Sequence, residues 1–126
     1  MKFEEINPPR LFGVGQNDEI QLKDCARIDL APDEQVTFVT DSGSEYDVVK
    51  KAWGYYATPS LNGRLPSFGL RGVLVKSSDG KCFLMLVEGT KEGDFQHYLK
   101  SHGLNVLCWL DSDSSLADLE QKLKEI

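Results

Sequence analysis

Apolar and polar side chains alternate with a period of two through much of the first half of the chain. Residues 20–30 carry two such apolar pairs, which predicts a strand with a bend or bulge over residues 23–27. The β-branched run at 36–40 and the run at 45–53, separated by a Gly-Ser turn, predict two more strands. Residues 1–19 are interrupted by prolines and glycines and predict an irregular strand or arm.

Two apolar runs in the second half are separated by Asp79-Gly80, which predicts a β-hairpin formed by residues 70–78 and 81–88. The second run is apolar on both faces, so we expect it to be the central strand of a sheet. A further apolar run at 105–110 predicts another strand. The connection to it is long enough for a crossover that would make it parallel to the second strand of the hairpin.

The spacing of apolar residues changes to that of a helix in two places. Residues 91–102 predict a helix followed by Gly103, which is suited to end it in the left-handed conformation. The apolar face of this helix consists of Phe95, Tyr98, Leu99 and His102. A final helix is predicted to begin at a Ser115 cap, with Asp118 three residues further on. Its predicted buried stripe consists of Leu116, Leu119, Leu123 and Ile126.

The order of these elements, with strands first and helices last, predicts an α+β fold. We expect a β-rich N-terminal half of strands and turns, followed by a C-terminal half with the order β-hairpin, helix, strand, helix. The strands would form a single mixed or antiparallel sheet system with the two helices. The length of the chain favours a single domain over residues 1–126, in which residues 1–19 are the candidate arm.

The net charge of −6 narrows the range of functions. It argues against nucleic-acid binding and against a polybasic membrane anchor, since both need a basic face. No apolar run has the length of a membrane span, and the N-terminus lacks the features of a secretory signal. The widely spaced Cys25, Cys82 and Cys108 predict reduced thiols, the last two as small hydrophobes within apolar runs. We therefore expect a soluble, cytoplasmic protein.

Charge is distributed unevenly along the chain. Residues 48–78 contain five basic residues and no acidic residue, whereas the stretches before and after them have net charges of −7 and −4. Within this basic region lies the segment WGYYATPSLNGRLPSFG, residues 53–69, which has no clean period and is rich in aromatic and turn residues. A simple connection between two strands needs none of these aromatics, so residues 53–71 are the candidate site.

This segment predicts a pocket for a small anionic or sugar-type ligand, such as a sugar phosphate or a nucleotide sugar. Arg64 would clamp a phosphate or carboxylate, aromatic rings would stack on a sugar face, and Asn62-Gly63 would present backbone N–H groups. The predicted ligand-binding residues are Trp53, Tyr55, Tyr56, Asn62, Arg64 and Arg71. The alternative is structural: the aromatics fill a gap between sheet and loop, and the basic residues pair with the acidic N-terminal half of the same or another subunit.

The sequence evidence for a metal site, a cofactor site or a catalytic site is weaker than that for the ligand-binding segment. On a helix, His97 and His102 would lie about 140° apart around the axis and cannot share a metal ion, so we expect neither a metal nor a cofactor. Glu45 and Asp47 flank a turn and are candidates for a general base, with solvated turn residues as the alternative. Cys25, between a lysine and an arginine, is a candidate reactive thiol.

The stretch EYDVVKKAWGYYATPSLNGRL, with the later LMLVE and CWLD, resembles a group of small uncharacterised bacterial proteins that share a W-G-Y-Y-A-T-P-S-x-N-x-R-L pattern. The resemblance covers residues 35–111. Genes for these proteins often lie among genes for surface-polysaccharide or nucleotide-sugar metabolism. The resemblance implies a setting in glycan metabolism in a bacterial cytoplasm, and it carries over no activity and no catalytic residue.

Three hypotheses of function remain after the sequence is read. The first is a non-enzymatic binding or accessory protein that recognises an anionic sugar-type ligand, or a partner, through residues 53–71. The second is a small cofactor-independent isomerase or lyase that acts on a sugar derivative, with Asp47, Glu45 or a tyrosine hydroxyl as its base. The third is a homodimeric interaction subunit without a small ligand, paired through exposed strand edges.

Overall fold

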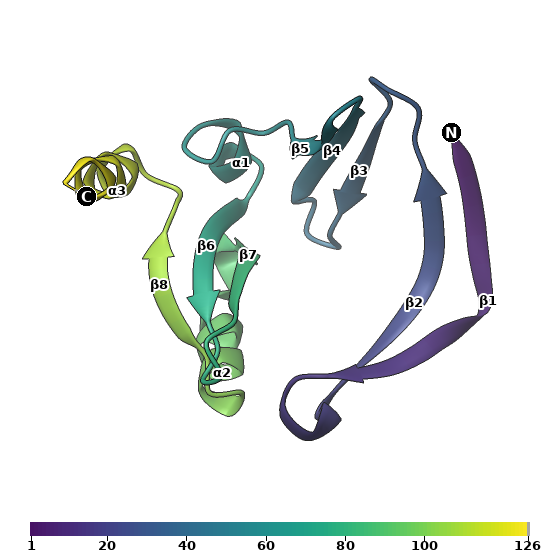
Figure 1. Cartoon of the computed structure of the whole chain (residues 1–126), viewed down its shortest axis with the longest axis horizontal. Helices are drawn as coiled ribbons and strands as arrows, with labels where there is room; N and C mark the ends of the chain where they lie inside the picture. Colours follow the sequence, from purple (N-terminus) through teal and green to yellow (C-terminus); the bar gives the residue numbers. More distant parts are fainter. Residues whose placement is uncertain (126) are drawn as a thin grey trace. The chain divides into compact units, whose positions relative to one another are not determined.

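A computed structural model describes residues 1–125 and confirms the α+β class (Figure 1). The strands are β1 (Lys2–Val14), β2 (Ile20–Asp29), β3 (Gln35–Val39), β4 (Glu45–Lys51), β5 (Gly54–Ala57), β6 (Leu70–Lys76), β7 (Cys82–Glu88) and β8 (Asn105–Trp109). The helices are α1 (Arg64–Ser67), α2 (Glu92–Ser101) and α3 (Asp113–Lys124), with single 3-10 turns at Gln16–Asp18 and Gly89–Lys91. The strands form three antiparallel sheets with the orders β1–β2, β3–β4–β5 and β7–β6–β8.

The chain forms two compact units. The first unit consists of Met1–Gln35 and Val49–Tyr56. The second unit consists of residues 36–48 and 57–125. All contacts described below lie within one or the other of these units.

The first unit contains a long antiparallel ribbon of β1 and β2 (Figure 1). Its register is interrupted between Glu5 and Arg10, and Pro8 and Pro9 lie in this interruption. A proline has no N–H to donate to the neighbouring strand, so the extra residues bulge out of β1. The expectation of an irregular N-terminal strand is confirmed. The bend or bulge expected over residues 23–27 coincides with this interruption, which falls between Asp24 and Ala26 of β2, although the extra residues are in β1.

The second unit is built on the sheet in which β6 is the central strand, antiparallel to both β7 and β8. The prediction that residues 81–88 form the central strand is therefore wrong. Phe83 and Leu84 of β7 are exposed at the sheet edge, whereas Val73 and Val75 of β6 are fully buried. A run of apolar residues indicates low polarity but does not reveal which strand has neighbours on both sides.

The connection from β7 through α2 to β8 passes over the central strand. Because both β7 and β8 are antiparallel to β6, they run parallel to each other, as the predicted crossover requires, although β8 pairs with β6. The core of this unit comprises Val73, Val75, Val87 and Leu99, the last contributed by α2. Phe95 of α2 packs edge-on against Trp109 of β8, with ring centroids 5.9 Å apart. The helix predicted over residues 91–102, with Gly103 just after it, is confirmed.

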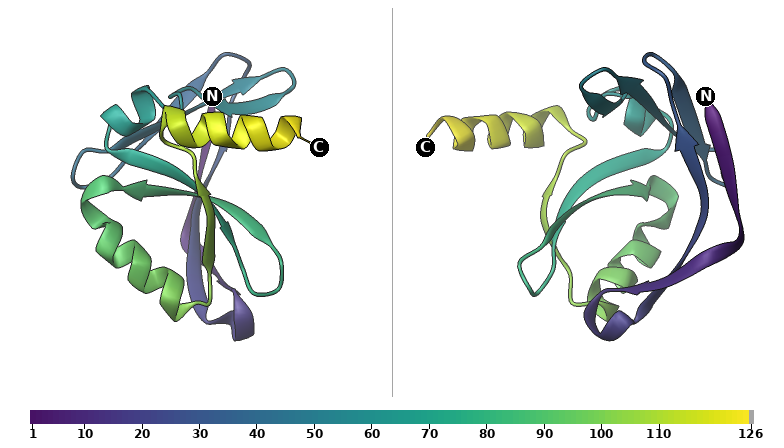
Figure 2. Two further views of the ribbon diagram at one scale, coloured as in Figure 1. Left: turned by 90° about the vertical axis from the view of Figure 1, so that its left-hand side faces the viewer. Right: turned by 45° about the vertical axis from the view of Figure 1, so that its right-hand side comes forward.

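The last helix, α3, differs from its prediction at both the cap and the buried stripe. The cap is Ser112, not Ser115: the Ser112 Oγ accepts a hydrogen bond from the Ser115 N–H at 3.1 Å. Ser115 is the third helical residue, and its hydroxyl donates back to the Ser112 carbonyl. Among the described residues of α3 none is buried, and Leu123 is 61% exposed. The helix extends away from the sheet (Figure 2), and Ile126 lies outside the described residues.

Candidate functional site

The segment at residues 53–69 contains two elements that the sequence pattern did not predict, β5 and α1. In α1, Leu65 is only 1% exposed and attaches the segment to the second unit. The turn before α1 is closed by Ser60, whose Oγ accepts the Arg64 N–H at 3.0 Å. A Cβ on Gly63 would lie 2.5 Å from this Oγ, so a side chain there would displace the Ser60 hydroxyl from its hydrogen bond. This half of the segment is ordered by packing and by local hydrogen bonds.

Three of the four aromatic side chains of the segment lie in the first unit and are largely exposed, and the fourth, Phe68, lies in the second unit. Trp53, Tyr55 and Tyr56 are 71%, 57% and 46% exposed. The rings of Trp53 and Tyr56 are nearly parallel, with an interplanar angle of 16° and a centroid separation of 6.0 Å. Gly54, at a φ of 144°, makes the turn that carries the chain from one ring to the next. We call Trp53, Tyr55 and Tyr56 the aromatic platform.

Two lysines flank the aromatic platform. The Lys50 Nζ donates a hydrogen bond to the Lys51 carbonyl at 3.0 Å and lies 5.1 Å from the centroid of the Tyr55 ring. The Lys51 Nζ pairs with the Asp33 carboxylate at 2.5 Å. This hydrogen bond, together with the negative charge of Asp33, raises the pKa of Lys51. The Lys51 ammonium is therefore already paired with a carboxylate, whereas the Lys50 ammonium lies beside a ring of the platform.

Arg64 lies in the second unit, where it pairs with a buried carboxylate. Its Nη2 donates to the Asp47 Oδ2 at 3.0 Å and to the Thr58 Oγ1 at 2.9 Å. Asp47 is 6% exposed, and its other carboxylate oxygen accepts a hydrogen bond from the Thr37 hydroxyl at 2.6 Å. The backbone N–H of Thr58 also donates to the Asp47 carbonyl. The guanidinium thus neutralises a carboxylate within its own unit.

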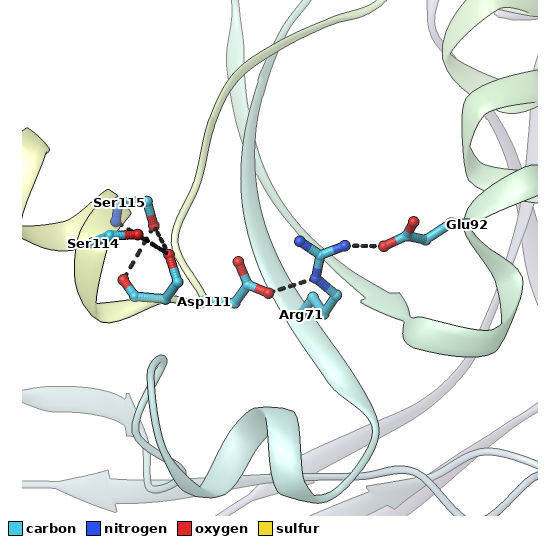
Figure 3. A network of polar contacts seen from close by, with 6 residues as sticks. Arg71, Glu92, Asp111, Ser114 and Ser115 are labelled. Atoms are coloured by element: carbon cyan, nitrogen blue, oxygen red, sulfur yellow. Dashed lines mark hydrogen bonds and ion pairs between the residues drawn. The ribbon is translucent and has the colours of Figure 1, made fainter.

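Arg71 is held in a second network of ion pairs (Figure 3). Its Nε donates to the Asp111 carboxylate at 2.5 Å, its Nη1 donates to Glu92, and its guanidinium lies 4.0 Å from the centroid of the Trp109 ring. The network connects β6 with the start of α2 and with the end of β8, next to the Ser115 turn that opens α3. One cation here faces two carboxylates, so the local charge does not favour an anionic ligand.

The six predicted ligand-binding residues therefore fall into two groups. The aromatic platform is one group, in the first unit, and Asn62, Arg64 and Arg71 are in the second unit. The Asn62 amide donates to the Asp113 carboxylate at 2.7 Å, so all three polar residues contact carboxylates. For Arg64 this matches the structural alternative, in which basic residues pair with the acidic N-terminal half.

The pattern of residues did not indicate which carboxylates pair with the arginines. Asp111 and Glu92 are far from Arg71 in the sequence, and only the β6–β8 pairing and the position of α2 bring them together. A weak signal exists for Asp47, which sits among apolar residues in a predicted strand. An ionised side chain in such a position needs a partner, and Arg64 is a nearby cation.

Other candidate groups lie apart from these networks. The thiols of Cys25 and Cys82 are exposed, so the expectation that Cys82 is a buried small hydrophobe is wrong; Cys82 is the first residue of the edge strand β7. Among residues 1–125, no group of three or more His, Cys, Asp or Glu side chains is arranged to hold a metal ion. Over the same residues, the helices are too short or too polar to span a bilayer.

Comparisons of the chain with protein-family models, with curated proteins and with solved structures find no match.

Proposed function

We propose that this chain is a non-enzymatic binding module that holds an anionic sugar-type ligand on its aromatic platform. Trp53 and Tyr56 would stack on the face of the sugar or of an attached base. Lys50 would attract the phosphate or carboxylate of the ligand. The setting proposed for this activity is bacterial carbohydrate or surface-polysaccharide metabolism in the cytoplasm, as implied by the resemblance of residues 35–111.

The exposure of the aromatic platform is the observation that carries this proposal. Trp53 is 71% exposed, and its ring and that of Tyr56 are nearly parallel. Rings that only filled a gap in the core would be buried, and large exposed aromatics leave apolar surface in water that a ligand can cover. The rings that would stack on the ligand come from one short stretch of the chain. The turn between β4 and β5 is therefore enough to form this binding surface.

A protein partner or a second copy of the chain is the second candidate for this surface. Exposed apolar residues also occur on the strands, at Phe3, Leu11, Phe38 and Phe83. Trp and Tyr are enriched at the centres of protein interfaces, so the platform suits this occupant too. Sedimentation at increasing concentration separates the two: a homodimer predicts an increase in mass, whereas the ligand-binding proposal does not require one.

An isomerase or lyase is the weakest of the three candidates. Its general base would have to be Asp47 or Glu45. Both oxygens of the Asp47 carboxylate accept hydrogen bonds from Arg64 or Thr37, so this group is poorly placed to take a proton from a substrate. Unchanged turnover of sugar derivatives after Asp47→Asn and Glu45→Gln would remove this candidate.

Replacement of Trp53 by alanine tests the ligand proposal. We expect Trp53→Ala to weaken binding of a sugar phosphate or nucleotide sugar by about tenfold or more, because a stacking surface is lost. The measurement is calorimetric titration with glucose 1-phosphate and with a uridine diphosphate sugar. Phe3→Ala is the matched control, since Phe3 is also a largely exposed aromatic of the first unit, and it should leave the affinity unchanged. Equal affinities of wild type and Trp53→Ala would contradict the proposal.

A further inference from the structure

The second unit has an open hollow on its surface, with a volume of about 380 Å³ and a lining that includes no residue of the aromatic platform. It is formed by the turn between β3 and β4, the end of α1, and the start of the connection from β7 to α2. Its lining residues are Ser42, Gly43, Ser44, Ser67, Phe68, Gly69, Gly89 and Thr90. The volume lies within the range of small-molecule sites.

A single carboxylate, that of Glu88, organises the hydroxyl groups beside this hollow. The Ser42 hydroxyl donates to the Glu88 Oε1 at 2.6 Å, and the Thr40 hydroxyl donates to the same oxygen. These two hydrogen bonds, with a smaller contribution from Ser44, lower the pKa of Glu88. The carboxylate is therefore ionised at neutral pH, and the hydroxyl protons of Ser42 and Thr40 point to it. The Thr40 Oγ1 already accepts the Ser44 N–H at 3.1 Å, so the lone pairs of the Ser42 hydroxyl are the ones left to accept hydrogen bonds from a ligand.

Most of the hydrogen-bond donors around the hollow are likewise used within the chain. The Ser67 hydroxyl donates to the Arg64 carbonyl at 2.7 Å. Six backbone N–H groups of the lining donate to neighbouring oxygens: those of Gly43, Ser44, Ser67, Phe68, Gly69 and Gly89. The hollow consequently offers oxygen acceptors and few donors. The charge of the Glu88 carboxylate beside it is partly offset, because the Lys91 Nζ lies 4.0 Å from the Glu88 Oε2. A lining with few donors disfavours an anion and favours a ligand that donates hydrogen bonds.

Two features give the hollow its shape. Phe68 is exposed in its wall and offers a ring on which an apolar sugar face can pack. Gly69 has a φ of 92°, and a Cβ there would lie 2.6 Å from the Ser44 Oγ. A side chain at this position would therefore displace the Ser44 hydroxyl from the carboxylate. The glycine keeps both the backbone turn and the array of hydroxyls intact.

We infer that this hollow binds a small polyhydroxylated ligand with an amino group, of the amino-sugar class. The ammonium and hydroxyl groups of the ligand would donate to Glu88 and to the oxygens of Ser42 and Ser67, and its apolar face would pack on Phe68. The inference does not depend on the aromatic platform, because every residue that it uses belongs to the second unit.

The test is a titration followed by amide chemical shifts, with glucosamine, methyl glucoside and glucose 6-phosphate as probes. We expect glucosamine to shift the amides of residues 42–44, 67–69 and 89–90, methyl glucoside to shift the same amides at higher concentration, and glucose 6-phosphate to bind more weakly than either. Glu88→Gln should weaken glucosamine binding by about tenfold, because a charged acceptor is lost. Shifts at these amides also distinguish this site from the aromatic platform.

A matched control is available in the turn between β6 and β7. Asp79 is also a carboxylate that accepts a serine hydroxyl, from Ser77, and its pKa is also lowered by that hydrogen bond. Asp79→Asn should leave glucosamine binding unchanged. If Glu88→Gln fails to fold, Ser42→Ala serves instead and should weaken binding. The absence of shifts with glucosamine, or tighter binding of glucose 6-phosphate than of glucosamine, would overturn the inference.

Discussion

Replacing Arg64 with alanine is expected to lower the free energy of unfolding of the second unit by about 2–3 kcal/mol. The physical reason is Asp47, which is buried and would keep a negative charge without the cation that neutralises it. Removal of one member of a fully buried ion pair costs more than this, but the Arg64 side chain is itself nearly half exposed, and water reduces the loss. Urea denaturation measures the effect.

Two further variants make this result specific. Arg10→Ala removes an ion pair with Asp24 whose two side chains are both accessible to solvent, so it should cost about 0.5 kcal/mol or less. Asp47→Asn in the Arg64→Ala background removes the unpaired charge and should restore part of the lost stability. If Arg64→Ala proves no more damaging than Arg10→Ala, the buried pair does not stabilise this unit.

Leu65→Ala is expected to have an effect of similar or larger size, about 3 kcal/mol. Leu65 is 1% exposed, and one of its methyl groups lies close to Gly72 of the central strand, 4.0 Å from the position that a Cβ would take there. Truncation removes this apolar contact and leaves a cavity under α1. Thermal or urea unfolding measures the loss, and the effect should fall on stability while ligand affinity at the aromatic platform is retained.

Leu123→Ala is the matched control for this prediction. It is the same chemical change at a leucine that is 61% exposed on α3, where alanine also has the higher helix propensity. We expect a change within about 0.5 kcal/mol. Similar losses for the two variants would show that the burial of Leu65 in the second unit is not a source of its stability.

Local patterns account for most of the fold. Alternation predicted β2 and β3, short runs of residues predicted β4 and β8, the Asp79-Gly80 dipeptide predicted the hairpin, and a 3.6-residue period predicted α2. Patterns of this kind depend on neighbours within a few residues, so they carry no information on which strands become adjacent. The central position of β6 arises from long-range pairing with two strands, and the apolar residues of β7 gave the opposite expectation.

The charge of the candidate site likewise could not be predicted from the order of residues along the chain. The excess of basic residues at 48–78 is a property of the sequence, but the positive charge is largely neutralised in the folded chain. Arg64 contacts Asp47, Lys51 contacts Asp33, and Arg71 contacts two carboxylates from later elements. A count along the chain records charges in order, whereas ion pairs depend on distance in space. The aromatic residues form no ion pairs. Their prediction as candidate ligand-binding residues therefore did not depend on which distant residues become neighbours in the fold.

The central position of β6 also determines the order in which the second unit can fold. The β6–β7 hairpin closes through a tight turn and can form within microseconds, whereas β8 can pair with β6 only after the intervening chain, including α2, has closed a much longer loop. Val87→Ala in the hairpin should therefore slow refolding, and Val106→Ala in β8 should mainly speed unfolding, which stopped-flow kinetics can distinguish. Until β8 arrives, β6 has one unpaired edge, and this intermediate stage is the one most exposed to aggregation.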